Sequence, residues 1–280
     1  MKNQEKLKHN TCFTVRIQFF YSTTNFLSLS KTSHISKHPV ILSIAGFDPS
    51  SGAGITADVK TAEQTGSYAL GVNTAITIQH ESKFTAISWV DESIIIDQLN
   101  ILSEKYNLDY IKIGLIENLS LIKTFHNLCP KAKIIWDPII KASAGFSFHS
   151  MTSQKQLEEA ANLCYLITPN LVEWEQIGAI IKGKTNILLK GGHANDHAND
   201  ELMFEDGASL RLYGKRIEVT EKHGSGCVLS TAITSYLAQG YGLGDACQKA
   251  KEYITTFLKS TDGLLGIHKV HSSLQNALST

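Results

Sequence analysis

The sequence predicts an α/β protein in which a mostly parallel β-sheet is covered by helices on both faces and ends in a short antiparallel edge. From His38 onward, short runs of β-branched and aliphatic residues alternate with amphipathic stretches of helical length. The short runs are apolar throughout, which is typical of strands buried on both faces. Around residues 199–219 the pattern changes to short segments separated by turn residues, which favours antiparallel strands at one edge.

The elements follow one another in the order that a parallel sheet with right-handed crossovers requires. The expected strands are residues 40–46, 110–114, 133–137, 165–170 and 186–192. The expected helices are residues 53–65, 92–106, 118–128, 152–163, 171–178, 226–239 and 244–260. No internal repeat of solenoid length is visible, so these elements are assigned to one domain, residues 38–280.

The composition excludes several classes of protein. Of the 280 residues 42% are hydrophobic and 19% are charged, which is typical of an ordinary globular protein and not of a disordered one. The 26 basic residues balance the 26 acidic residues, so bulk attraction to nucleic acid is not indicated. No stretch approaches the roughly 20 consecutive apolar residues of a membrane span. We therefore expect neither a nucleic-acid nor a membrane partner.

The cysteines indicate a reducing compartment. Their number is odd, they are far apart in the sequence, and no pair or neighbouring histidine has zinc-ligand spacing, which argues against a disulfide framework and against zinc. A cytoplasmic location follows. The five are Cys12, Cys129, Cys164, Cys227 and Cys247.

Residues 1–37 differ from the rest of the chain in charge, because they carry six lysine or arginine residues and one acid, Glu5. Arg16 interrupts the one candidate apolar core of a secretory signal, and no small-residue cleavage site follows it. We expect a basic, disordered N-terminal extension. An upstream stretch included by a wrong start assignment is the alternative.

The strongest local motif is "KHGSGCVLSTAITSYLAQG", residues 222–240, where a glycine-rich turn leads directly into a helix. Small residues allow several backbone N–H groups to converge, and the helix N-terminus adds partial positive charge, so this turn predicts an anion site. Cys227 falls in the first turn of the helix, where a thiolate is stabilised. The structural alternative is an ordinary loop followed by a buried cysteine.

Polar residues also follow the other expected strands. Residues 45–61, "AGFDPSSGAGITADVKT", form a second glycine-rich turn that contains Asp48 and leads into a helix with Asp58. Carboxylate and amide oxygens at converging loops suit magnesium, and a lysine there can meet a phosphate. Taken singly, each such residue is more often a helix cap or a solvated side chain. The remaining candidates are Gln79, Asp137, Asn170, Glu173 and Lys190.

These motifs, in this order, resemble one known family. They are "SIAGFDPSSGAGITADVKT", "TAITIQ", "IKIGLI", "WDPIIKASAG", "ITPNLVE", "LLKGGH" and "HGSGC". From about His38 to about Ile267 the chain resembles the hydroxymethylpyrimidine and phosphomethylpyrimidine kinases of thiamine biosynthesis, which belong to the ribokinase-like superfamily. The resemblance implies a three-layer ribokinase-like fold.

The resemblance also implies an activity and a set of site residues. Such enzymes use ATP and magnesium to phosphorylate 4-amino-5-hydroxymethyl-2-methylpyrimidine and then its monophosphate. The implied substrate-binding residues are Gln79, Gly46, Asp58, Leu115 and Ile139. The implied ATP-binding residues are Lys190, Asn170 and Glu173, and the implied magnesium ligands are Asp137 and Glu173. The implied anion hole is Gly224, Ser225 and Gly226, and Cys227 is the implied base.

Three alternatives to this function remain. A pyridoxal or pyridoxine kinase is the nearest, because relatives with the same cysteine motif phosphorylate the hydroxymethyl group of those rings. A thiazole or sugar kinase fits "TAITIQ" and Cys227 less well. A catalytically idle ligand-binding relative belongs to a different class, and the intact phosphate motifs argue against it. By analogy with the family, we expect a homodimer.

Overall fold

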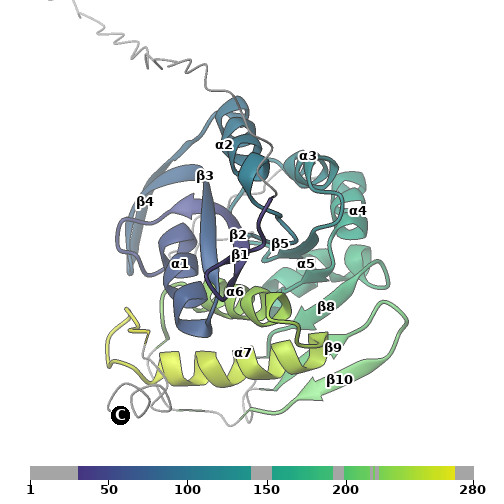
Figure 1. Cartoon of the computed structure of the whole chain (residues 1–280). Helices are drawn as coiled ribbons and strands as arrows, with labels where there is room; N and C mark the ends of the chain where they lie inside the picture. The colour runs from purple at the N-terminus through teal and green to yellow at the C-terminus, as the bar shows by residue number, and fades with distance from the viewer. Residues whose placement is uncertain (1–30, 140–152, 192–198, 215–216, 218–220, 269–280) are drawn as a thin grey trace, which may run out of the picture. The chain divides into compact units, whose positions relative to one another are not determined.

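A computed structural model describes residues 31–139, 153–191, 199–214, 217 and 221–268 (Figure 1). The strands are β1 (His34–Ile35), β2 (His38–Phe47), β3 (Tyr68–His80), β4 (Lys83–Trp89), β5 (Tyr110–Ile113), β6 (Lys133–Trp136), β7 (Leu166–Ile167), β8 (Asn186–Leu189), β9 (Asp200–Met203) and β10 (Ser209–Leu212). The helices are α1 (Gly54–Thr65), α2 (Glu92–Lys105), α3 (Ser120–Leu128), α4 (Gln154–Leu163), α5 (Leu171–Ile181), α6 (Ser225–Ala238) and α7 (Leu243–Leu258).

The sheet has the strand order β10-β9-β8-β7-β6-β5-β2-β3-β4. The strands from β8 to β3 in this order pair in parallel. The expected antiparallel edge is present as β9 and β10. The fold class is therefore the one that the sequence predicts.

Two hydrophobic cores lie on the two faces of the sheet, which gives three layers (Figure 1). Helices α2, α3, α4 and α5 pack on one face, and α1, α6 and α7 pack on the other. The strands serve both cores, because successive side chains point to opposite faces. In β6, for example, Ile134 and Trp136 belong to the first core and Ile135 to the second.

The sheet has a second antiparallel edge that the sequence analysis did not anticipate. Strand β3 is 13 residues long and continues past the end of β2, because its last pairing with β2 joins Ile76 to Phe47. From Ala75 to His80, β3 also pairs with β4, and a tight turn at Glu81 and Ser82 joins the two strands. The resulting β3–β4 hairpin extends past the edge of the parallel strands and carries Gln79 with it.

The start of the chain's packed region also differs from expectation. Strand β1 pairs with β2 at Pro39 and His38, and the Thr32 backbone N–H donates to the Lys105 carbonyl at 3.0 Å. Residues 31–37, which the sequence analysis placed in the extension, therefore pack against the sheet and α2. Residues 1–30 lie outside the described residues.

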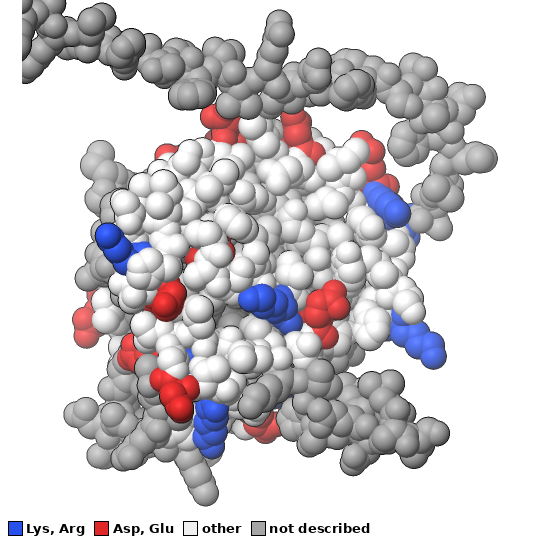
Figure 2. All heavy atoms as spheres, turned by 90° about the vertical axis from the view of Figure 1, so that its left-hand side faces the viewer, with Lys and Arg blue, Asp and Glu red and all other residues white. Residues whose placement is uncertain are grey.

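Charged side chains are interspersed on the face shown in Figure 2. Lysine and arginine alternate with aspartate and glutamate over the coloured part of that face, without a continuous basic surface. Among the described residues, no helix is long and apolar enough to cross a membrane.

Candidate active site

A cavity of about 610 Å³ lies at the carboxyl ends of the parallel strands, the edge where doubly wound sheets bind ligands. It is lined by both glycine-rich loops, by the ends of β5, β6 and β8, by the N-terminus of α5 and by the β3–β4 hairpin. Twelve of the thirteen site residues expected from the sequence line it: Gly46, Gln79, Leu115, Asp137, Ile139, Asn170, Glu173, Lys190, Gly224, Ser225, Gly226 and Cys227.

The first glycine-rich loop is organised by Asp48. Its carboxylate accepts hydrogen bonds from the Ser50 and Ala53 backbone N–H groups, both at 2.9 Å, and from the Ser50 hydroxyl. Gly54 follows with φ +61°, and a Cβ at that position would collide with the Gly46 carbonyl oxygen. The loop therefore needs glycine at residue 54 to fold back onto the end of β2.

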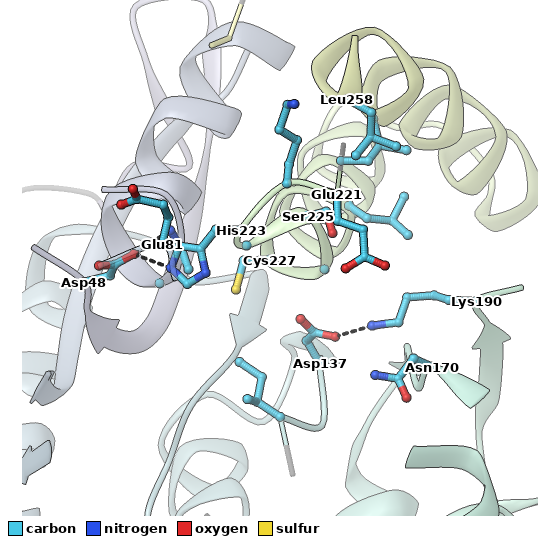
Figure 3. A pocket seen from close by; sticks show the side chains of 18 of the residues that line it. Asp48, Glu81, Asp137, Asn170, Lys190, Glu221, His223, Ser225, Cys227 and Leu258 are labelled. Carbon is cyan, nitrogen blue, oxygen red and sulfur yellow. Dashed lines mark hydrogen bonds and ion pairs between the residues drawn. The ribbon is translucent and has the colours of Figure 1, made fainter. Parts of the chain in front are cut away.

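The second glycine-rich loop is joined to the first by a buried pair. His223 Nε2 lies 2.8 Å from Asp48 Oδ2, as Figure 3 shows, and the His223 backbone N–H donates to the Leu264 carbonyl at 2.9 Å. Gly224 is the N-cap of α6 with φ +74°. Ser225, Gly226 and Cys227 form the first turn of α6, so their backbone N–H groups are at the positive end of the helix dipole.

Asp137, which is buried, forms an ion pair with the partly buried Lys190, and in Figure 3 this pair lies on the other side of Cys227 from Asp48 and His223. Lys190 Nζ lies 2.9 Å from Asp137 Oδ1, which also accepts a hydrogen bond from Thr168 Oγ1 at 3.0 Å. Burial alone would raise the pKa of Asp137, but the Lys190 and Lys112 ammonium groups more than offset it and hold that pKa below its ordinary value. Both groups are therefore charged at neutral pH.

The second glycine-rich loop lies close to this ion pair. A Cβ placed on Gly226 would lie 3.4 Å from Asp137 Oδ2 and 3.5 Å from Lys190 Nζ. The α6 N-terminus, a carboxylate and an ammonium group thus meet at one point of the cavity, which suits an anion that is accompanied by a cation.

Asn170 and Glu173 have a structural role in addition to their position in the cavity. Asn170 Oδ1 accepts from the Glu173 backbone N–H, and Glu173 Oε2 accepts from the Asn170 backbone N–H, both at 2.8 Å. This reciprocal pair is a capping box at the N-terminus of α5. The capping role that the sequence analysis set against ligand binding is therefore present.

Cys227 is buried at the floor of the cavity. Burial is the largest influence on this thiol and raises its pKa to about 11, while the Lys112 ammonium group and a hydrogen bond from the Gly54 backbone N–H act in the opposite direction. The helix N-terminus favours a thiolate, as expected from the sequence, but burial of the side chain has the larger influence on the pKa of this thiol. At neutral pH the resting group is a thiol.

The hairpin side of the cavity has a different character. Gln79, Leu115 and Ile139 line it together with Thr77 and Phe84. A Cβ on Gly46 would lie 3.2 Å from Leu115 Cδ2, so a larger residue at position 46 would narrow the space beside Leu115. Amide, apolar and aromatic groups around a small volume suit a flat heterocyclic ring.

Asp58 is the expected site residue that the structure does not bring to the cavity. Its side chain is fully buried and accepts hydrogen bonds from Ser43 Oγ at 2.6 Å, Lys112 Nζ at 2.7 Å and Thr231 Oγ1 at 2.7 Å. With its oxygens engaged by protein donors, Asp58 supports the floor of the site and does not contact a ligand there.

Several residues around the site escaped the sequence analysis. His223 lies within the second glycine-rich motif but was not singled out as a site residue. Lys112 interrupts the apolar strand β5, and this interruption was the one local signal of a buried charge. Asp200 and Lys251 both line the cavity and form an ion pair at 2.6 Å. The two are 51 residues apart in the chain, so no local pattern joins them.

The fold and the site first define a class. A three-layer α/β protein with an anion-binding helix N-terminus, a lysine and carboxylates at the carboxyl edge of its sheet is typical of ribokinase-like small-molecule kinases. The model of the phosphomethylpyrimidine kinase family matches residues 48–272. The chain belongs to that family.

Individual relatives agree with this assignment. The chain is 32% identical over 245 residues to the hydroxymethylpyrimidine/phosphomethylpyrimidine kinase of Rhizobium meliloti, which covers 80% of this chain and 92% of that protein. Other curated relatives are longer, and the chain spans about half of their length, 52% of one and 49% of another.

Two solved structures are similar to this one. An ADP complex of Bacillus subtilis pyridoxal kinase has a TM-score of 0.73 and 27% identity, covering 86% of this chain and 99% of that chain. A phosphomethylpyrimidine kinase from Clostridium difficile has a TM-score of 0.66 and 31% identity, covering 79% of this chain and 99% of that chain. The fold is therefore ribokinase-like.

Proposed function

We propose that this protein transfers the γ-phosphoryl group of ATP to the hydroxyl of 4-amino-5-hydroxymethyl-2-methylpyrimidine, and then transfers a second phosphoryl group to the resulting monophosphate. One observation carries the proposal. A single cavity is lined by an anion-binding helix N-terminus with Lys190, by a ring-sized pocket with Gln79, and by Cys227. Membership of the phosphomethylpyrimidine kinase family supports the choice of ring.

The first transfer needs a base, because a hydroxymethyl group is a poor nucleophile until its proton leaves. The resting thiol of Cys227 first loses its proton to water, and the thiolate so formed takes the hydroxyl proton and becomes a thiol again. The substrate oxygen bonds to the γ-phosphorus while the bond from that phosphorus to the β–γ bridging oxygen breaks, and ADP leaves with the electron pair. The backbone N–H groups of Ser225 and Gly226 and the Lys190 ammonium group stabilise charge on the transferred phosphoryl oxygens.

The second transfer needs no base of comparable strength. A phosphate monoester has a second pKa of about 6, so its attacking oxygen is already anionic near neutral pH. Cys227 therefore contributes mainly to the first transfer. The α6 N-terminus and Lys190 serve both transfers, because both pass a phosphoryl group through the same anion site.

Magnesium fits the residues present. The ion prefers oxygen ligands, keeps several waters and uses only one or two protein carboxylates beside the phosphates. Asp137 and Glu173 offer carboxylates to the cavity, and Asp137 Oδ2 is directed toward the Gly226 backbone. Among the described residues there is no group of three or more His, Cys, Asp or Glu that could hold a metal ion. The ion would neutralise charge on the triphosphate.

Pyridoxal phosphorylation is the second candidate function. It is favoured by the similarity to the Bacillus subtilis pyridoxal kinase structure, which has a higher TM-score than the phosphomethylpyrimidine kinase structure. The curated relative with 92% of its length covered favours the pyrimidine ring. The two candidates share the phosphate site and differ in the ring that the hairpin side accepts.

The test is ATP turnover by the purified protein with Mg²⁺, with the hydroxymethylpyrimidine, its monophosphate and pyridoxal supplied separately and the products resolved by mass. The expected result is conversion of both pyrimidines to the diphosphate, with slow turnover of pyridoxal. Gln79→Ala is expected to raise the KM for the pyrimidine about tenfold, because a ring donor or acceptor loses its partner. Preference for pyridoxal would move the function to that ring, and inactivity on all three would indicate an idle relative.

The outer face of the β3–β4 hairpin supports a homodimer. Ile76 and Ile78 are 51% and 62% exposed, and they alternate along β3 with Thr77 and Gln79, which face the cavity. A second copy covering these isoleucines removes apolar surface from water. Light scattering on the purified protein tests this, with Ile78→Lys expected to shift the mass to that of a monomer.

A cytoplasmic location completes the proposal. The four described cysteines, Cys129, Cys164, Cys227 and Cys247, are buried free thiols, which suits a reducing compartment. Fractionation of the source cells with an antibody to the protein tests the location, and recovery from an oxidising compartment would contradict it.

A further inference from the structure

Beneath the cavity lies a buried ion pair that substrate does not reach. Lys112 Nζ on β5 and Asp58 Oδ2 on α1 are 2.7 Å apart, and both side chains are fully shielded from solvent. A buried ion pair is weak evidence of stabilisation, because the cost of desolvating two charges offsets their attraction, and well-packed apolar side chains are often as stable. A contribution to folding stability therefore does not by itself explain why this ion pair lies under the site.

The carboxylate of the pair is held from three elements. Asp58 accepts from Ser43 Oγ on β2 at 2.6 Å, from Thr231 Oγ1 on α6 at 2.7 Å and from Lys112. In the described part of the chain, Asp58 is the one hydrogen-bond acceptor of Lys112 Nζ. The ammonium position is thereby fixed, and a Cβ on Gly114, at the end of β5, would lie 2.8 Å from it.

This network is connected to Cys227 in two ways. Thr231 follows Cys227 by four residues on α6, so the two side chains share one face of that helix. Lys112 and Cys227 also interact electrostatically through the buried interior. The Lys112 ammonium group is consequently a fixed positive charge that interacts with the thiol but does not line the cavity.

We propose that Lys112 is a positioning residue that supports the thiolate form of Cys227, with Asp58 and Thr231 fixing its charge relative to α6. The inference rests on the proposed function, in which Cys227 takes the hydroxyl proton. Lys112 transfers no proton itself. It stabilises the negative sulfur before the transfer, and the sulfur becomes neutral when it accepts the proton.

The charges around Cys227 act in both directions. Lys112 from β5 and Lys190 from the end of β8 favour the thiolate, as does the Gly54 backbone N–H of α1, whereas Asp58 and Asp137 oppose it. Lys112 is the main group that lowers the pKa of Cys227. The network through Asp58 and Thr231 ties this ammonium group to the helix that carries the thiol, so we expect the thiolate to be less stable when both members of the buried pair are removed.

The decisive variant is the double substitution Asp58→Asn with Lys112→Met, because it removes both charges and leaves no buried ion unpaired. The single substitution Lys112→Met leaves Asp58 uncompensated and is expected to lower thermal stability. If the pair were needed only for folding, the double variant would recover the stability and the activity together. If Lys112 supports the thiolate, the stability recovers and the thiol chemistry does not.

The first readout is the rate of alkylation of Cys227 by iodoacetamide at pH 8, resolved by peptide mass spectrometry. It needs no substrate, so it remains informative even if the proposed function fails. The rate should fall about tenfold in the double variant, which corresponds to roughly one unit of thiol pKa. The control, Glu159→Gln with Lys155→Met, removes an exposed ion pair on α4 that does not line the cavity and should leave this alkylation rate within about twofold.

The second readout separates the two phosphoryl transfers. In the double variant the first transfer should slow at least tenfold, and the second, whose nucleophile is already ionised, should change by less than about threefold. Native alkylation kinetics in a folded double variant, or equal slowing of both transfers, would overturn the proposal. Turnover by the native protein is measured alongside, so that inactivity on both pyrimidines counts against the proposed function alone.

Discussion

Lys190 Nζ lies 2.9 Å from Asp137 Oδ1, so the lysine assigned to a nucleotide phosphate and the carboxylate assigned to magnesium are partners of each other. In the proposed function, ATP binding would be an exchange of partners, in which Lys190 would interact with a phosphate oxygen and Asp137 would hold the cation. Two cation–anion pairs, Lys190 with Asp137 and the cation with ATP, would exchange partners, so each charge would stay compensated.

The exchange predicts a strong effect of Lys190→Met on ATP use. A hydrogen bond to a charged group is worth about 1.5–3 kcal/mol, so kcat/KM for ATP should fall by about 10- to 150-fold. Steady-state kinetics with varied ATP measure this. The control is Lys182→Met, on an exposed lysine at the end of α5, which should stay within about twofold of native. An unchanged kcat/KM for ATP in Lys190→Met would remove Lys190 from the phosphate site.

The close packing of the second glycine-rich loop predicts contrasting effects of two glycine substitutions. Gly224 and Gly183 both have φ +74°, but a Cβ on Gly224 would collide with the first glycine-rich loop, whereas a Cβ on Gly183 meets open space. Gly183→Ala should cost about 1 kcal/mol of unfolding free energy from backbone strain alone. Gly224→Ala should cost at least twice as much and also lower phosphoryl transfer. Urea denaturation compares the two, and equal losses would mean that the loops do not pack as described.

Cys227→Ala should separate the two half-reactions. A positioned base contributes 10²–10⁴-fold, so the first phosphorylation should fall by about that factor, while the second should fall less than about fivefold. Each half-reaction is assayed with its own substrate. Cys164→Ala is the matched control, because it truncates another buried cysteine whose pKa is raised by burial and which does not line the cavity. A similar loss in both half-reactions would assign Cys227 a structural role.

The raised pKa of Cys227 predicts how the first phosphorylation depends on pH. Below a pKa of about 11 the thiolate fraction increases about tenfold per pH unit, so kcat/KM should rise steadily between pH 7 and 9. The second phosphorylation should be nearly flat over the same range, because the substrate phosphate is already ionised. Rate profiles for both substrates in one buffer series test this. Parallel profiles would contradict a thiolate base.

Features that depend on neighbouring residues in the sequence could be predicted, whereas features that depend on distant residues could not. The parallel strands were predictable because their apolar runs supply side chains to both hydrophobic cores, as Ile134 and Ile135 do in β6. Strand β4 was not, because it is only half buried and its pairing depends on the unusual length of β3. Gln79, Asp137, Asn170 and Lys190 were predictable from the strand ends at which they fall, whereas Leu115 came only from the family resemblance.

The support beneath the site was not predictable, because its partners are distant in the sequence. Asp58 and Lys112 are 54 residues apart, and Asp48 and His223 are 175 residues apart. Asp58 looked like a ligand because it follows a glycine-rich turn, yet its position on α1 directs it into the interior. Only the packing of α1 against α6 and the sheet reveals that role.

A competition assay tests most directly whether the protein phosphorylates the pyrimidine in preference to pyridoxal. Hydroxymethylpyrimidine and pyridoxal are mixed in equal amounts with Mg²⁺ and limiting ATP, and the phosphorylated products are counted by mass over time. We expect pyrimidine monophosphate to appear first and then to decline as the diphosphate accumulates, with little pyridoxal phosphate. Predominant formation of pyridoxal phosphate, or pyrimidine monophosphate that accumulates without conversion, would contradict it.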